Sequence, residues 1–325
     1  MSYAVINIGH NPRKLIEETT YSYTEGGAPV NVTEYVDPPG LAGYRKCVHV
    51  PEKGVKIFSV KNKQEQTYGF ESNKYSEATV YLWREDKRYE KPLLVQLGNS
   101  YFRSDDGQSW TRISLSPSEM VKILDSENCK RNGTHKIDLS KGHTFNRKDA
   151  PKSYKCSSCK EEEITITSEK CDGVIYSYHD TSKGLVSKVE DNGVDQNGIF
   201  VPLGTSRVYL FYARNRGNKC VLINMTKPKN LWYRRKSKRG STWVQVEKGN
   251  EPIAYFDSFA ILSIIQGSST TPQTASTSYS RITTTMASLV ATMVVGFFAW
   301  EGLMMVKNPD KSLILEVKNK FIKPE

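Results

Sequence analysis

The sequence predicts a mostly β protein: a β-rich α+β chain of two related β-sheet modules, a short helix after each, and one C-terminal transmembrane helix. Three observations predict this fold class. Val, Ile, Tyr and Trp cluster in runs of about five to eight residues between Gly, Asn, Asp and Lys, as in strands and turns. The same order of runs occurs twice. One 21-residue apolar segment, residues 286–306, follows both copies and is long enough to cross a bilayer.

The repeat is clearest between Val80–Ser114 and Val208–Val246. Both stretches open with Val-Tyr-Leu and an aromatic residue, continue through a Lys and an aliphatic run, and close on Gly-x-x-Trp. The offset grows from 128 residues at the opening to 133 at the closing Trp, so the second copy has a loop longer by five residues. Because each copy is long enough for a domain, we predict modules at residues 1–128 and 129–266.

Local signals place a hairpin and a helix in the first copy. Asp105-Asp106-Gly107 separates two aromatic-rich runs and predicts a hairpin turn. Ser116-Pro117-Ser118-Glu119 is a capping box with Pro at the first helical position, and Met120, Ile123 and Leu124 then form one apolar face. The matching segment of the second copy, residues 253–265, is so rich in apolar residues that helix and strand both stay open.

The C-terminal region predicts an anchored protein. Residues 267–285 are dominated by Ser and Thr and predict a flexible stalk, and residues 286–306 carry only one charge, Glu301, near one end. Residues 307–325 contain five Lys and three acidic residues. Because positive charge stays on the cytoplasmic side, we expect a cytoplasmic tail and extracellular modules, with the lipid bilayer as a partner.

The N-terminal residues contain no apolar run of the kind found in secretory leaders. Two explanations follow. In the favoured one, a leader is missing from this chain. In the other, the C-terminal helix is itself the targeting signal, and the modules face the cytosol as a scaffold on an internal membrane.

A net charge of +11 suits either an anionic partner or a charge that serves solubility with no partner. The stretch 214–248 holds eleven basic residues and one acidic residue. Its densest part is a candidate anionic-ligand patch: Arg234, Arg235, Lys236, Lys238 and Arg239. Guanidinium groups beside aromatic rings suit sulfate, sialate or phosphate, so we predict an acidic glycan or a host protein as ligand. The membrane anchor argues against nucleic acid, and a solvated hairpin without a ligand stays an alternative.

Six cysteines are candidates for disulfides: Cys47, Cys129, Cys156, Cys159, Cys171 and Cys220. The spacing Cys156-x-x-Cys159 also suits a zinc knuckle, with Cys129, Cys171, His135 and His143 near it in sequence. A second pair at metal-ligand spacing is missing, and an extracellular chain favours disulfides. We therefore predict disulfides and no metal, while six cysteines allow fifteen pairings.

No residue pattern predicts catalysis. Asp105-x-Gly107-x-x-Trp110 overlaps the Asp-box of sialidases, but the second copy keeps only Gly240 and Trp243 of it, which indicates a structural turn. The five histidines show no spacing to a nucleophile. We expect no catalytic residue, no cofactor and no enzymatic activity.

The order VYLW, KPLLV, YFRSDDGQSWTRIS, a helix, Cys129, HKIDLS and YKCSSC resembles the repeat modules of the FAINT-type (frequently associated in Theileria) lineage-expanded proteins of piroplasm parasites. The resemblance covers residues 80–250 closely and the rest loosely. It implies a secreted or surface-exposed parasite protein, and no catalytic residue carries over. With the anchor, it predicts a single-pass surface protein with a non-enzymatic binding or antigenic role.

Overall fold

A computed structural model describes residues 3–11, 20–71, 74–142, 152–213, 219–237 and 240–266. The predicted stalk, anchor and tail, residues 267–325, lie outside the described residues. Within them the chain is mostly β, as predicted, with two short α-helices. Among the described residues, no helix has both the length and the apolar composition that a membrane crossing requires.

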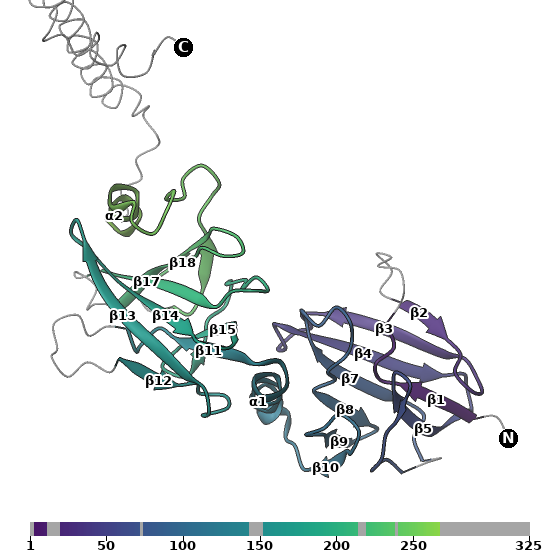
Figure 1. Ribbon diagram of the computed structural model, residues 1–325. Coiled ribbons are helices and arrows are strands. Elements are labelled where there is room, and N and C mark those ends of the chain that lie inside the picture. Colours follow the sequence, from purple (N-terminus) through teal and green to yellow (C-terminus); the bar gives the residue numbers. More distant parts are fainter. Residues whose placement is uncertain are drawn as a thin grey trace, which may run out of the picture. The chain divides into compact units, whose positions relative to one another are not determined.

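The first module contains ten strands and one helix (Figure 1). The strands are β1 (Tyr3–Asn7), β2 (Thr20–Tyr23), β3 (Val30–Val36), β4 (Tyr44–Pro51), β5 (Lys56–Asn62), β6 (Glu65–Gln66), β7 (Ala78–Trp83), β8 (Leu94–Leu97), β9 (Ser100–Arg103) and β10 (Thr111–Ile113). A 3-10 turn, Pro117–Glu119, then leads into α1 (Met120–Asn132).

The second module repeats this series and ends in its own helix. The strands are β11 (Thr134–Asp138), β12 (Ser153–Lys155), β13 (Glu163–Cys171), β14 (Val174–Thr181), β15 (Leu185–Asp191), β16 (Val194–Asp195), β17 (Arg207–Ala213), β18 (Lys219–Met225), β19 (Leu231–Arg235) and β20 (Trp243–Gln245), followed by α2 (Ser258–Gln266). The structure thus resolves the open prediction for residues 253–265 in favour of a helix that begins at Ser258, while residues 253–257 form turns before it.

Both modules have the same sheet topology. Each has a three-stranded sheet, in the order β1-β5-β6 or β11-β15-β16, and a seven-stranded antiparallel sheet, β10-β9-β8-β7-β4-β3-β2 or β12-β13-β14-β17-β18-β19-β20. The parallel pairs β1–β5 and β11–β15 shift register at the same place, between Ala4 and Val5 and between His135 and Lys136. The shared irregularity supports the predicted duplication.

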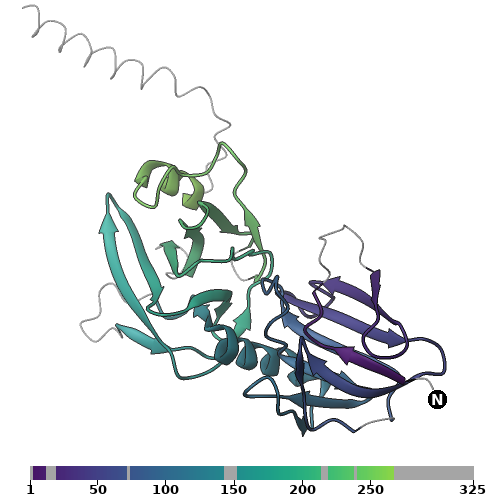
Figure 2. The ribbon, with the colours of Figure 1, turned by 45° about the vertical axis from the view of Figure 1, so that its right-hand side comes forward.

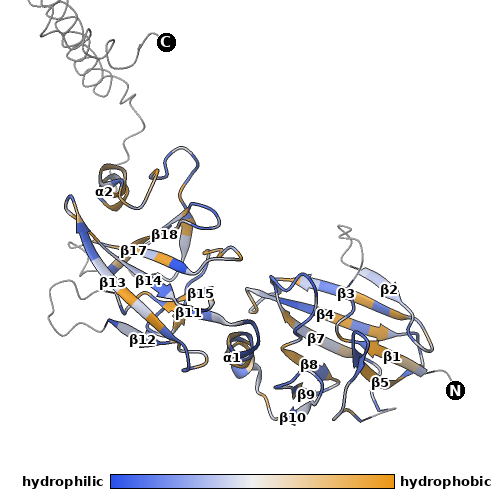
Figure 3. Ribbon diagram, in the orientation of Figure 1, coloured by the Kyte–Doolittle hydropathy of each residue, from blue (hydrophilic) through white to orange (hydrophobic). Residues whose placement is uncertain are grey.

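Each module is layered around its large sheet (Figure 1 and Figure 2). In the first module, apolar side chains of β1 and β5 pack on one face, and α1 packs on the other through Met120 and Leu124. In the second module, α2 packs on the large sheet through Ile261 and Ile265. Apolar residues accordingly gather on the strands and polar ones at the turns (Figure 3). Strands buried on both faces, such as β7, therefore read as continuous apolar runs.

The pairing registers refine the predicted repeat. His49 pairs with Ala78 and its counterpart His179 pairs with Val208, an offset of 130 residues (208 − 78). The Val-Tyr-Leu sequences match at an offset of 128. On β7 and β17 the sequence match is therefore displaced by two residues from the match given by strand pairing. A shift of two residues keeps each side chain on the same face of the sheet, so the same residue types still coincide. The predicted hairpin, between β9 and β10, and the predicted helix face are both confirmed.

The helix α1 crosses the predicted boundary at residue 128 and continues to Asn132. Its start follows the predicted capping box, since the Glu119 carboxylate accepts hydrogen bonds from the backbone N–H and hydroxyl of Ser116, at 3.2 and 2.6 Å. Its end is set by Gly133, whose φ of 61° is left-handed and favours glycine. The helix thus belongs to the first module by packing and leads directly into β11.

One buried polar network occurs in both modules. In the first, the backbone N–H of Asn7 donates to the Tyr23 hydroxyl (2.9 Å), which lies 3.1 Å from Nδ1 of His49. In the second, the N–H of Asp138 donates to the Tyr154 hydroxyl (3.0 Å), which lies 2.9 Å from Nδ1 of His179.

Each network joins the small sheet to the large sheet, because its backbone donor and its histidine lie on different sheets. Burial lowers the pKa of both His49 and His179 to about 3, so both imidazoles are neutral at physiological pH.

Candidate functional site

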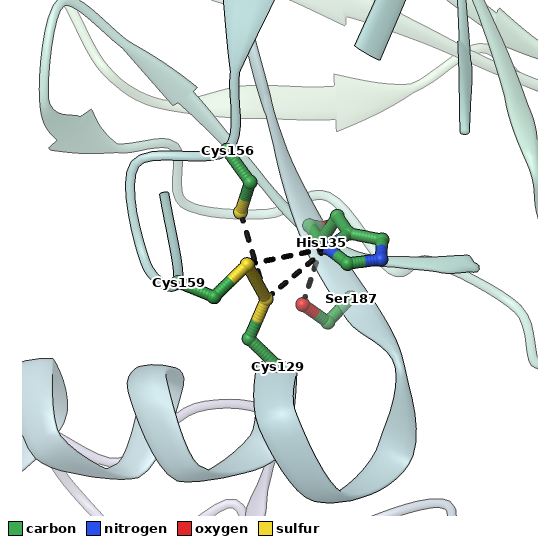
Figure 4. Close-up of a disulfide and its surroundings, with 5 residues drawn as sticks. All are labelled: Cys129, His135, Cys156, Cys159 and Ser187. Carbon is green, nitrogen blue, oxygen red and sulfur yellow. Dashed lines mark hydrogen bonds between the residues drawn. A yellow bond between two sulfur atoms is a disulfide. The ribbon is translucent and has the colours of Figure 1, made fainter. Parts of the chain in front are cut away.

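Four side chains that can bind a metal converge in the second module (Figure 4). Cys129 comes from the last turn of α1, His135 from β11, and Cys156 and Cys159 from the turn between β12 and β13. Their ligand atoms all lie within 4.8 Å of one another. Three separate elements of the chain therefore meet at one point.

The local sequence explains how these side chains meet. Gly133 ends α1 and turns the chain back, so that His135 follows beside Cys129. The Cys156–Cys159 turn is closed by a hydrogen bond from the N–H of Lys160 to the carbonyl of Cys156, at 2.8 Å. Lys160 has a φ of 58°, which folds the chain back around both sulfurs.

The distances within the cluster are short. Nδ1 of His135 lies 3.1 Å from Sγ of Cys129 and 3.8 Å from Sγ of Cys159, and the sulfurs of Cys129 and Cys156 are 3.8 Å apart. The structure joins Cys129 to Cys159 as a disulfide, with their Cα atoms 5.8 Å apart. Cys156 remains a free thiol beside it.

The surroundings favour a thiolate at Cys156, which is fully buried. Burial raises its pKa, but hydrogen bonds from His135 and from the backbone N–H groups of Lys136, Cys159 and Ser158 outweigh this and lower the pKa below its ordinary value. Backbone donors directed at a sulfur are the environment that a metal-bound thiolate needs.

The imidazole of His135 is fixed by its neighbours. A side chain at Gly184 would collide with Nε2 of the ring, so the ring packs directly on that glycine. The carbonyl of His135 accepts a hydrogen bond from the hydroxyl of Ser187, at 3.3 Å. Nδ1 is thereby held toward the three sulfurs.

Ion pairs beside the cluster connect α1 to the second module. The Asp125 carboxylate lies 2.7 Å from Nζ of Lys136 and 2.7 Å from Nζ of Lys188, and it also accepts a hydrogen bond from the hydroxyl of Tyr44. These charges lower the pKa of Asp125 although its burial alone would raise it. The helix that carries Cys129 is therefore held in place independently of the cysteines.

The other predicted cysteines do not join the cluster. Cys47 and Cys220 are buried as free thiols, and Cys171 lies at the end of β13 beside Asp172. His143 lies outside the described residues. Of the six candidate disulfide cysteines, the structure brings together only three.

The predicted anionic-ligand patch needs one correction. Arg235 points inward: its side chain is 3% exposed, its guanidinium lies 2.7 Å from the Asp191 carboxylate, and it covers the ring of Trp243. This arginine holds the structure together and is unavailable to a ligand. Arg234 and Lys236 are exposed as predicted, and Lys238 and Arg239 lie outside the described residues.

All four cluster residues are visible in the sequence, but only Cys156 and Cys159 have the spacing of a metal-ligand pair. The other two ligands, Cys129 and His135, lie on either side of a helix end. The useful signal is a Cys before and a His after a helix-ending glycine, followed by Cys-x-x-Cys.

No protein-family model, curated protein or solved structure matches this chain.

Proposed function

We propose that this chain is a non-enzymatic binding protein that displays two β modules on a membrane through the predicted anchor at residues 286–306, and that it belongs to the FAINT-type proteins it resembles. One observation carries the binding role: the duplicated modules share buried structural residues and differ in the charge of an exposed turn.

The pairs that the modules share are internal. The hydroxyls of Tyr23 and Tyr154 lie beside Nδ1 of equivalent histidines. Trp110 and Trp243 are also equivalent, and both are buried. Histidines that are buried and neutral in both copies support the structural role of these networks. A scaffold kept constant beneath a changing surface is what a family of binding or antigenic modules requires.

The turn after β9 and β19 shows the surface change. The registers of β9–β10 and β19–β20 make Asp105 equivalent to Lys236, and both are exposed. The charge of this turn is therefore reversed between the modules. A basic turn in the second module supports an acidic glycan or an acidic protein surface as its ligand.

Heparin chromatography of the full chain tests this ligand. Replacing Arg234, Lys236, Lys238 and Arg239 by Ser, with Arg235 kept so that the module folds, should lower the salt concentration of elution. A matched control replaces four basic residues of the first module: Lys53, Lys56, Lys87 and Arg88. The control should elute at higher salt than the patch variant, and equal elution of the two variants would contradict the ligand proposal.

A second candidate function is a cytosol-facing scaffold inserted in an internal membrane by its C-terminal helix. The cluster of Cys129, Cys156, Cys159 and His135 favours it, because thiols gathered with an imidazole stay reduced in the cytosol. Protease protection of an N-terminal epitope tag on intact cells separates the two. Digestion of the tag supports surface display, and protection supports the scaffold.

A further inference from the structure

We propose that the reduced chain binds one zinc ion through Cys129, His135, Cys156 and Cys159, as a structural Cys3His centre that joins α1, β11 and the β12–β13 turn. The proposal rests on the positions of these four side chains and does not depend on the anionic-ligand role.

Two of the three separations match tetrahedral zinc, and the sulfurs of Cys129 and Cys159, joined as a disulfide, would separate on reduction. Zinc bonds of about 2.3 Å to sulfur and about 2.0–2.1 Å to nitrogen place two sulfurs about 3.8 Å apart and a sulfur and a nitrogen about 3.6 Å apart. The Cys129–Cys156 sulfurs are 3.8 Å apart, and Nδ1 of His135 is 3.8 Å from Sγ of Cys159 and 3.1 Å from Sγ of Cys129.

A disulfide alone accounts for only half of the cluster. It uses Cys129 and Cys159 and leaves a buried thiol, Cys156, and an imidazole, His135, directed at the same point (Figure 4). Backbone N–H groups of Lys136, Ser158 and Cys159 also donate to the Cys156 sulfur, which takes no part in that disulfide. Reduction of the pair and binding of a metal use all four side chains at once.

The ligand set selects the metal and its role. Three thiolates and one imidazole suit zinc, whereas magnesium and calcium prefer oxygen ligands. Four protein ligands complete a tetrahedron and leave no position for water or substrate. Cys129, His135 and Cys156 are each at most 5% exposed. The centre is therefore structural.

The first module shows what the zinc would replace. There, the β2–β3 turn is attached to β1 by a hydrogen bond from the N–H of Ala28 to the carbonyl of Tyr3, at 2.8 Å. Matched bulges on β1 and β11 make buried Ala4 the counterpart of His135. In the second module the equivalent turn carries Cys156 and Cys159. The same junction is thus closed by a backbone bond in one copy and by a metal in the other.

Metal analysis of the purified full chain tests the proposal. Chain prepared in detergent with a phosphine reductant and zinc, then desalted, should contain one zinc per chain. Cys156→Ser should lower the zinc content by at least about 10-fold, whereas the matched control Cys171→Ser, outside the cluster, should keep it. Reduced wild-type chain without zinc, or a Cys156→Ser chain that retains it, would overturn the proposal.

A second variant that keeps all four ligand residues is needed, because Cys156→Ser also loses zinc if it misfolds. A Cβ at Gly184 would meet both the His135 ring and the Gly133 carbonyl, so Gly184→Ala displaces the ring and the end of the helix that carries Cys129, and it should weaken zinc affinity by roughly 10–100-fold, as changes in the outer shell of metal sites do. Cobalt added to reduced wild-type chain should give the intense visible bands of a tetrahedral thiolate site. Weak bands typical of octahedral cobalt, or affinity unchanged in Gly184→Ala, would contradict the geometry.

Discussion

The two modules have one topology but close the same junction differently. In the first, the turn after β2 is attached to β1 by a backbone hydrogen bond, and Glu25 of that turn forms ion pairs with Lys61 and His10. In the second, the turn after β12 brings Cys156 and Cys159 to His135 on β11. The comparison teaches that a shared backbone architecture does not fix the chemistry that holds it together.

The two modules are therefore stabilised by different kinds of interaction. Backbone hydrogen bonds and ion pairs of the first module form in any compartment. The cluster of the second module depends on the redox state of three thiols and on the supply of metal. Cys129 also extends the cluster to α1, although the Asp125 ion pairs hold that helix to the second module without the cysteines.

The largest expected effect is that of metal removal. Structural zinc contributes about 10–16 kcal/mol in zinc-finger peptides, which equals the free energy of unfolding of a whole domain. Chelation under reducing conditions should therefore unfold the second module and leave the first folded. Hydrogen exchange measured by mass spectrometry should show lost protection in β13 and β14 and retained protection in β3 and β4. Equal loss in both modules would show that the second module does not depend on metal more than the first.

Removal of the equivalent tryptophans ranks next. Trp110→Ala and Trp243→Ala should each lower the free energy of unfolding of their module by about 3–5 kcal/mol, as for other buried aromatic residues. Both Nε1 groups donate a hydrogen bond, Trp110 to Gly107 at 3.3 Å and Trp243 to Gln196 at 2.9 Å. The loss at Trp243 should be larger, because its ring also lies under Arg235.

Urea unfolding followed by hydrogen exchange assigns each loss to its module. Tyr68→Ala, at an exposed position, is the control and should change little. A Trp243→Ala variant as stable as wild type would mean that the closing Gly-x-x-Trp is not a core element.

Acid should weaken both modules through the paired histidines. The folded pKa of His49 and His179 is about 3, below the ordinary value near 6.5, so the unfolded chain takes up protons first as pH falls. Their stabilisation is complete above pH 6.5 and declines toward pH 3. Between pH 6.5 and pH 5 each module should lose about 2 kcal/mol of unfolding free energy.

Urea titrations at pH 7 and pH 5 measure that loss. The second module should lose more than the first, because metal binding is weaker in acid. Equal acid slopes in the two modules would argue against a metal in the second.

The smallest expected effect is that of the network tyrosines. Tyr23→Phe and Tyr154→Phe each remove one hydroxyl from equivalent networks and should each cost about 1–2 kcal/mol, nearly equal in the two modules. Tyr35→Phe, at an exposed position, is the control. Thermal unfolding of the three variants is sufficient, and a loss confined to one module would show that the networks are not equivalent.

Much of the fold follows from the sequence. The strand runs, the Asp105–Gly107 hairpin, the capped helix and the duplication were all predictable because they depend on local residue choice. The run of basic residues wrongly placed Arg235 in an exposed patch. Side chains of a strand alternate between its two faces, so Arg235 lies on the inward face of β19 with Tyr233. Arg234, between them, faces solvent.

The candidate site was only half predictable. Cys-x-x-Cys is a local signal, but its meeting with Cys129 and His135 depends on a turn folding onto a strand that precedes it in the chain. Spacing along the sequence does not report such tertiary contacts. The predicted anchor, by contrast, is a composition signal in residues outside the described part, and it stays a prediction.

X-ray absorption at the zinc K-edge distinguishes a thiolate-bound metal from every other arrangement of the cluster. Reduced full-length chain loaded with zinc should show three sulfur neighbours at about 2.3 Å and one nitrogen neighbour at about 2.0–2.1 Å. In Cys156→Ser, the zinc should have one sulfur neighbour fewer, or the zinc signal should be absent. A first shell made only of oxygen and nitrogen, or the same shell in wild type and Cys156→Ser, would contradict the claim that the second module is closed by a metal.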